Sequence, residues 1–155
     1  MRLNLEDLGL RGGQCHVCTY TIGIAPVTLG GANYEVVVPE GVTVSVDRIA
    51  GGYLVHLEMS ARVFGPCARC LRETGIQVVA EEEEFVPTTA GGWAESESSP
   101  FVAHMLVDLS GLSREALVLA MPERVLCSQE CKGLCAQCGT DLNASQCGCE
   151  ALEIS

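Results

Sequence analysis

A chain of 155 residues, of which 48% are hydrophobic, is long enough to form one domain with a buried core. Its formal net charge is -11, because only 9 Lys and Arg stand against 20 Asp and Glu. Nucleic-acid-binding proteins usually present a basic face to the phosphates. The charge therefore disfavours direct RNA binding and favours a basic protein as the partner.

The N-terminal residues contain acids where a signal peptide has a continuous apolar run. No stretch of the sequence approaches the ~20 apolar residues of a membrane span. We therefore expect a cytoplasmic protein that makes no membrane contact. In a reducing cytosol, ten cysteines indicate metal or redox chemistry rather than disulfide bonds.

The first half of the chain shows the alternation of half-buried β-strands. Valines alternate with polar residues in 42–47, and the same period of two recurs in 53–64. Gly51-Gly52 between these segments allows a tight turn, so the two strands are predicted to pair antiparallel. Further strands are expected at 19–27, 34–38 and 75–85.

Residues 88–100 are poor in apolar side chains and rich in Gly, Ser and Glu, which predicts an exposed, mobile loop. Trp93 lies within this segment. A lone Trp in a loop more often folds back onto its own domain than anchors a partner, and we favour that interpretation here.

A helix is predicted at 109–121, with Asp108 or Ser110 as N-cap and Pro122 after its end. One apolar stripe is expected to cover the β-layer. Its residues are Leu109, Leu112, Ala116 and Ala120. The helix would then deliver the chain to the cysteine-rich tail.

Eight of the ten cysteines have the spacing of zinc ligands. Cys67 and Cys70 form a C-x-x-C in the connection between two predicted strands. The other six lie in the tail: Cys127, Cys131, Cys135, Cys138, Cys147 and Cys149. Zn²⁺ binds four thiolates tetrahedrally at ~2.3 Å, and an all-cysteine set is typical of structural rather than catalytic zinc. The sequence therefore predicts two structural zinc ions, with an iron–sulfur cluster as the weaker alternative.

Two pairings of the cysteines are open. In the first pairing, the first four cysteines of the tail form a local site, and the last two join the upstream C-x-x-C. In the second pairing, the first two cysteines of the tail join the upstream C-x-x-C, and the last four form a small knuckle. We favour the second pairing, because its first site would clip the end of the helix onto the β-domain. The C-x-C at Cys147/Cys149 is tighter than usual and is the least secure pair.

Other polar groups have simpler interpretations. Cys15 and Cys18 are more readily two reduced cysteines on a strand edge than a redox pair, since the following sequence is strand-like. His56 is expected on a solvated strand face, and His104 as a substitute ligand is the weaker reading. For Glu81–Glu84 we favour a solvated face or a fraying strand end over an acidic patch that binds a basic partner.

Taken together, these motifs resemble the YceD family, the large ribosomal RNA subunit accumulation proteins of bacteria and plastids. The resemblance covers roughly residues 53–150. The residues that carry it are Cys67-Ala68-Arg69-Cys70-Leu71, Asp108-Leu109, Arg114-Glu115, Leu119-Ala120-Met121-Pro122, Leu126-Cys127, Cys131-Lys132-Gly133-Leu134-Cys135, Cys138-Gly139, Asp141-Leu142-Asn143 and Cys147-Gly148-Cys149. Family members without the Gly-Leu-Cys knuckle keep the C-x-R-C pair, which implies that Cys67 and Cys70 join the first two cysteines of the tail.

The expected fold is α+β: an antiparallel β-rich domain at 1–126 with one covering helix, and a cysteine-rich zinc-binding tail at 127–150 packed on it. The resemblance implies a non-enzymatic factor for large-subunit ribosomal RNA accumulation and ribosome biogenesis, acting through a basic ribosomal or assembly protein. No nucleophile–base constellation or phosphate-binding glycine loop occurs in the sequence, so we expect no small-molecule substrate. The alternative function is a thiol/zinc redox switch or holdase chaperone, in which oxidation ejects the metal.

Overall fold

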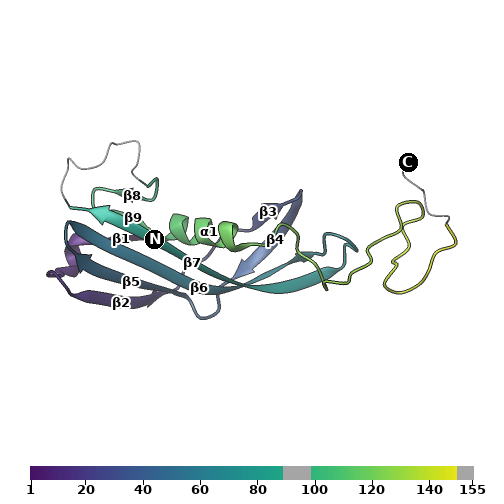
Figure 1. The fold of residues 1–155 in the computed structure, drawn as a ribbon, viewed down its shortest axis with the longest axis horizontal. Coiled ribbons are helices and arrows are strands. Elements are labelled where there is room, and N and C mark those ends of the chain that lie inside the picture. Colours follow the sequence, from purple (N-terminus) through teal and green to yellow (C-terminus); the bar gives the residue numbers. More distant parts are fainter. Residues whose placement is uncertain (89–98, 150–155) are drawn as a thin grey trace.

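The computed structural model describes residues 1–88 and 99–149 (Figure 1). Its elements in chain order are β1 (Arg2–Asn4), η1 (Glu6–Leu8, a 3₁₀ turn), β2 (Cys15–Tyr20), β3 (Val27–Leu29), β4 (Ala32–Val37), β5 (Val42–Ile49), β6 (Gly52–Pro66), β7 (Glu73–Pro87), β8 (Val102–Ala103), β9 (Leu106–Asp108) and α1 (Leu109–Ala120). Most of the predicted loop at 88–100, including Trp93, lies outside the described residues. The expected mainly antiparallel β-fold with one helix is confirmed.

The main sheet is built around β6, a strand of 15 residues. It pairs antiparallel with β7 along its full length, from Gly52↔Pro87 to Pro66↔Glu73. On its opposite edge β6 pairs first with β5 and then with β4. β2 adds to β5 and β3 adds to β4. The predicted β5–β6 hairpin is confirmed, and its turn uses the positive φ of Gly51, +83°.

The alternation seen in the sequence separates the two faces of this sheet. Val42, Val44 and Val46 are fully buried, as are Val55 and Leu57 of the neighbouring strand. This inner face packs against α1, η1 and the small sheet β1–β9–β8, whose apolar residues belong to the same core (Figure 1). The outer face remains open to solvent and is mostly polar, as the period of two requires.

Helix α1 begins and ends close to its predicted bounds. The Asp108 carboxylate accepts a hydrogen bond from the Gly111 N–H at 3.3 Å, which confirms Asp108 as the N-cap. The predicted apolar stripe was wrong at Ala120, which is exposed. The buried face of the helix includes Leu117 instead. Ser113 is also buried and donates its hydroxyl to the Leu109 carbonyl at 2.6 Å. No helix in the described segments is long and apolar enough to cross a membrane.

The strand predicted at 19–27 was wrong over most of its length. β2 starts earlier and ends at Tyr20, and residues 21–26 are irregular. Ile22 and Ile24 of this segment are nevertheless buried, so their alternation reflects side chains that fill the core without ladder pairing. The Arg114 guanidinium of α1 holds the segment by donating to the Ala25 carbonyl at 2.9 Å.

β6 continues through Gly65 and Pro66, where the sequence predicted a strand end. The buried Tyr34 ring packs over Gly65, and a Cβ built there would lie 2.5 Å from the ring. The Tyr34 hydroxyl donates to the Pro66 carbonyl at 2.9 Å. Gly65 is therefore required for close packing, and it extends the β6–β7 hairpin to the C-x-x-C loop at its tip.

Candidate metal centre

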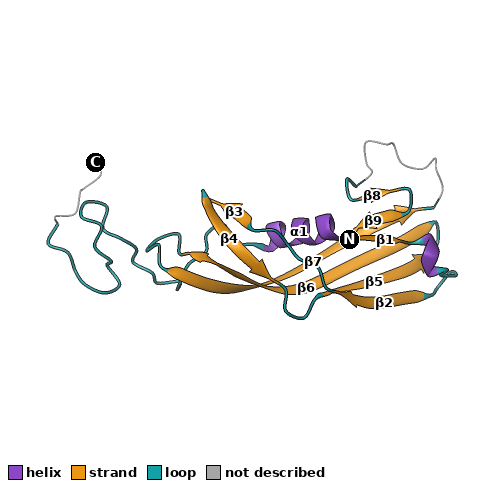
Figure 2. Cartoon of the chain, turned by 180° about the vertical axis from the view of Figure 1, so that it is seen from behind, coloured by secondary structure: helices purple, strands orange, loops and turns teal. Residues whose placement is uncertain are grey.

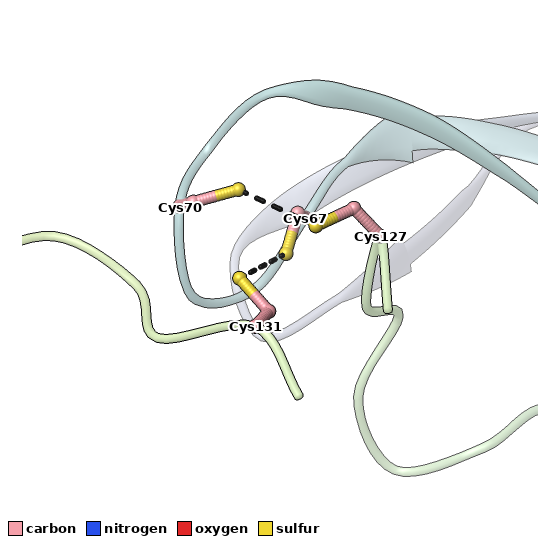
Figure 3. A group of neighbouring side chains, drawn as sticks. All are labelled: Cys67, Cys70, Cys127 and Cys131. Atoms are coloured by element: carbon pink, nitrogen blue, oxygen red, sulfur yellow. Dashed lines mark hydrogen bonds between the residues drawn. The ribbon is translucent and has the colours of Figure 1, made fainter. Parts of the chain in front are cut away.

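The first group of cysteines, called the proximal site, consists of Cys67, Cys70, Cys127 and Cys131. Their four sulfurs all lie within 4.8 Å of one another, and Figure 3 shows them converging from two separate segments. Cys67 Sγ is 3.8 Å from Cys131 Sγ, and Cys70 Sγ is 3.7 Å from Cys127 Sγ. Four sulfurs placed ~2.3 Å from one central ion would be separated by ~3.8 Å. The spacing of the sulfurs therefore fits a tetrahedral thiolate site.

Backbone hydrogen bonds position the two halves of the proximal site. The loop between β6 and β7 is closed by Cys67 N–H donating to the Arg72 carbonyl at 2.8 Å. The Ala68 N–H donates to the carbonyl of Val125 at 2.8 Å, which attaches the segment after α1 to this loop. The Arg69 guanidinium donates to the Cys131 carbonyl at 2.9 Å. These bonds explain how a C-x-x-C about sixty residues upstream meets the tail.

Three of the four cysteines of the proximal site are buried, whereas Cys127 is exposed. Cys67 has no exposed surface, and Cys70 and Cys131 are 4% and 3% exposed. Leu126 and Leu134 pack against these three sulfurs. A cluster of thiolates in such surroundings requires positive charge, since buried charges are otherwise costly. The donor set therefore fits a divalent ion that prefers sulfur, and it leaves no position for a catalytic water.

The pKa values of the thiols follow from this geometry. Burial acts to raise the pKa of Cys67, but the backbone N–H groups of Cys70, Arg69 and Cys127 stabilise its thiolate and lower the pKa to about 6. The sulfurs of Cys131 and Cys70 accept from the Cys127 thiol and, with burial, raise its pKa to about 12. Cys127 therefore keeps its proton near neutral pH, so binding a metal ion through this sulfur would release a proton.

The second group, called the distal site, consists of Cys135, Cys138, Cys147 and Cys149, whose sulfurs also lie within 4.8 Å of one another. The turn that holds its first pair is closed by Gly139 N–H donating to the Cys135 carbonyl at 2.9 Å. The distal sulfurs are less buried than the proximal ones, and Cys138 is exposed. Figure 2 shows that the tail is made of loops and extends beyond the end of β6 and β7.

The two groups match the pairing favoured from the sequence, in which the upstream C-x-x-C joins the first two cysteines of the tail. The distal site likewise contains the four that were expected to form the knuckle. The structure brings neither Cys15, Cys18 nor His104 into these groups.

Cys15 and Cys18 do not form a common site. Both lie on β2, at one edge of the main sheet, where Cys15 is opposite Asp47 and Cys18 is opposite Val44. Residues three apart on a strand point to opposite faces, so the two thiols point away from each other. Asp47 accepts from the Cys15 thiol and thereby raises its pKa. A redox pair at these positions is therefore contradicted, and the reading as two reduced cysteines on a strand edge fits.

The Glu81–Glu84 run does not fray from its strand. All four residues lie within β7 and are paired with β6. Glu81 and Glu83 are exposed on the outer face, whereas Glu82 and Glu84 are half-buried on the inner face. Burial raises the pKa of Glu84. His56 lies opposite Glu83 and is half-buried rather than fully solvated.

Sequence reasoning assigned no role to three residues that lie around the proximal site: Arg72, Asp141 and Asn143. Asn143 donates its amide to Cys131 Sγ at 3.4 Å, and Arg72 is paired with Asp141 at 3.1 Å. Burial acts to raise the pKa of Cys131, but the Asn143 amide helps to lower it. The only sequence signal was Asp141-Leu142-Asn143 as part of the family resemblance.

The thiols of the distal site differ in acidity. The Thr140 hydroxyl and backbone lower the pKa of Cys138 to about 6, whereas a thiol hydrogen bond to Cys138 raises that of Cys149 to about 12. Binding a metal ion here would therefore release the proton held by Cys149.

Comparison with known proteins places this arrangement in a family. A model of the large ribosomal RNA subunit accumulation protein YceD matches residues 55–155, which include every cysteine of both sites. Uncharacterized protein Rv2926c of Mycobacterium tuberculosis (strain ATCC 25618 / H37Rv) is 33% identical over 100 residues, which are 63% of this chain and 48% of that protein. Uncharacterized protein ML1660 of Mycobacterium leprae (strain TN) is 26% identical over 145 residues, or 90% of this chain and 66% of its own length.

The chain spans about half the length of the Mycobacterium tuberculosis relative that it matches. No solved structure matches the chain. The family match covers well over half of the chain, including the C-x-x-C loop, α1 and the tail. The chain therefore belongs to the YceD family.

Proposed function

We propose that this protein is a non-enzymatic, zinc-stabilised factor for large-subunit ribosomal RNA accumulation and ribosome biogenesis, which acts through protein contacts. The observation that carries the proposal is the proximal site. Its four cysteines come from the C-x-x-C loop and from the start of the tail, both within the region matched by the YceD family, and their sulfurs have tetrahedral spacing. The family description supplies the process, and the site supplies the physical role of the metal. We place this activity in the cytoplasm, where thiolates remain reduced.

Zinc is favoured over other ions by the donor set. Both groups offer four cysteine sulfurs and no carboxylate or imidazole, which suits Zn²⁺ in a closed structural site. Cys67 and Cys70 would hold one ion together with Cys127 and Cys131, and the last four cysteines of the tail would hold the other. A closed site supplies folding free energy rather than chemistry, which supports a factor that is not an enzyme.

The outer face of β6 and β7 is the part of the surface best suited to a basic partner. Glu58 lies directly opposite Glu81, and both are exposed. Like charges directly opposite each other on a sheet repel, so a cationic side chain placed between them would be favourable. Glu83 extends the same face. With a net charge of -11 and about two further negative charges for each Zn(Cys)₄ group, contact with naked RNA would be opposed.

The experiment that tests this proposal compares protein and RNA as ligands. We expect purified metal-loaded protein to bind fragments of large-subunit ribosomal RNA more weakly than ~1 µM at ~0.15 M salt in an anisotropy titration. Affinity purification from cells should instead recover a basic ribosomal or assembly protein after RNase treatment. Glu58→Gln combined with Glu81→Gln should weaken that recovery, whereas Glu6→Gln, in η1 and outside these two strands, should not.

Sub-micromolar binding to RNA alone, without a protein, would contradict the proposed mode of action. The same would follow if RNase treatment removed every specific partner. Recovery that increases with salt would contradict the charge argument, because attraction between exposed charges weakens as salt screens them.

A second candidate function is a thiol/zinc redox switch or holdase chaperone. It is favoured by the exposed Cys138, whose pKa is lowered to about 6, because an exposed thiolate is readily oxidised. Mild peroxide separates the two candidates. A switch would release metal and expose apolar surface at low peroxide, whereas a structural factor would keep its metal and its partner.

A further inference from the structure

The loop between the two cysteine pairs of the distal site lies against the proximal site. It spans residues 139–146, and within it Asn143 Nδ2 donates to Cys131 Sγ at 3.4 Å. The Oδ1 atom of the same side chain accepts from the Lys132 N–H at 2.8 Å. One side chain of the distal loop thus holds a proximal sulfur and the backbone that follows it.

Asn143 is itself held in place by Asp141. Asp141 Oδ1 accepts from both the backbone N–H and the Nδ2 of Asn143, each at 2.9 Å. Asp141 Oδ2 is 3.1 Å from the guanidinium of Arg72, which leaves the C-x-x-C loop two residues after Cys70. The amide donor is therefore oriented by groups from both sites in the folded tail, which keeps the entropy cost of the bond to sulfur low.

Backbone hydrogen bonds also join the C-x-x-C loop, residues 133–134 and the distal loop in sequence. Leu134 N–H donates to the Arg69 carbonyl at 3.3 Å, and Leu142 N–H donates to the Gly133 carbonyl at 2.9 Å. Gly133 has a φ of +75°, and a Cβ there would lie 3.1 Å from the Arg69 carbonyl oxygen. Leu134 also packs against the buried proximal sulfurs. The distal loop and the proximal site therefore form one continuous hydrogen-bonded unit.

We propose that Asn143 is a positioning residue that couples the two metal sites, so that filling one raises the affinity of the other. The inference rests on the proposed function, in which both groups hold metal. An amide that donates to a ligating sulfur stabilises the thiolate and fixes its direction. Because the loop that carries Asn143 also joins Cys138 to Cys147, ordering it at one site fixes the ligand separation at the other. Such coupling is reciprocal by linkage.

The test is a titration of full-length, chelator-treated protein with Co²⁺, whose thiolate complexes absorb light, while native mass spectrometry counts the ions per chain. At one equivalent of Co²⁺, wild type should populate mainly empty and doubly loaded chains. Asn143→Asp keeps the Oδ1 that accepts from Lys132 and removes the donor to sulfur. This variant should accumulate singly loaded chains, lose about 10- to 100-fold in affinity for the second ion, and shift the sulfur-to-cobalt charge-transfer band. Asn143→Ala should uncouple the sites in the same way.

Ser145→Ala, in the same loop and also exposed, is the control and should load like wild type. The inference is overturned if wild type fills its sites independently, or if Asn143→Asp still binds two ions with unchanged cooperativity and an unchanged band. If Asn143→Ala does not fold, the result for Asn143→Asp alone tests the coupling, and circular dichroism shows that its sheet is intact. If wild type binds no metal or only one ion, the proposed metal role fails together with this inference, and that outcome is distinct from two independent ions.

Discussion

Replacement of Cys67 by Ser should loosen the connection between α1 and the β6–β7 hairpin and destabilise the protein by about 3–5 kcal/mol, as expected when a buried charged group loses a partner. Cys67 is fully buried, and its loop is bonded to the segment after α1 through Ala68 and Val125. Without the Cys67 sulfur, the buried sulfurs of Cys70 and Cys131 must either leave the interior or keep their protons. Amide hydrogen exchange should then show lower protection in the last turn of α1 and in residues 121–134.

Cys138→Ser is the matched variant, because Cys138 belongs to the distal site and is exposed. Its effect should fall mainly on the tail after Cys131, to which the distal loop is hydrogen-bonded, with α1 as protected as in wild type. Cys15→Ser, outside both groups, should change neither region. Unchanged protection of α1 and residues 121–134 in Cys67→Ser would show that the proximal cysteines do not hold the helix end to the hairpin. Loss of α1 protection in Cys138→Ser would show that the distal site supports the whole fold.

The periodic parts of the fold could be predicted from the sequence because local pattern and burial agree there. In β5 and β6, every second residue faces the core, and Gly51 supplies the positive φ of the turn. Asp108 and Pro122 similarly bracket α1. The failures lie where tertiary contacts decide the conformation. Ile22 and Ile24 are buried from an irregular segment that Arg114 holds from outside the local sequence.

The two groups of cysteines could be predicted because cysteine is rare and a C-x-x-C turn restricts the spacing at which it presents two sulfurs to one point. The groups of sulfurs matched the favoured pairing, but the residues around them could not be assigned. Asn143 reaches Cys131 only because Asp141 and Arg72 bring the two loops together. An asparagine twelve residues from its sulfur has no periodic or spacing signal, and its role becomes apparent only in the folded chain.

Protein purified without chelator should contain two zinc ions per chain, and removing them should unfold the tail while the main sheet persists. The reason is the composition of the tail: within the described residues after Cys127 there is no helix or strand beyond an isolated bridge between Leu134 and Asp141. Such a segment buries too little apolar surface to offset its conformational entropy. Each structural zinc ion supplies an apparent ~10–16 kcal/mol of binding free energy near pH 7, which is ample to order it.

Elemental analysis measures the stoichiometry, and hydrogen exchange before and after chelation measures which residues lose protection. The distal ion should leave first, because none of the four distal cysteines is buried, whereas three of the proximal ones are. Acidification should act in the same direction, since protons compete with the metal for thiolates. One zinc ion per chain, or iron with visible absorbance, would contradict the assignment. Loss of protection in the paired part of β5 and β6, residues 42–49 and 52–59, along with the tail would show that the metal stabilises the entire domain. These residues exclude the end of β6 that leads to Cys67, and they are held by the main core.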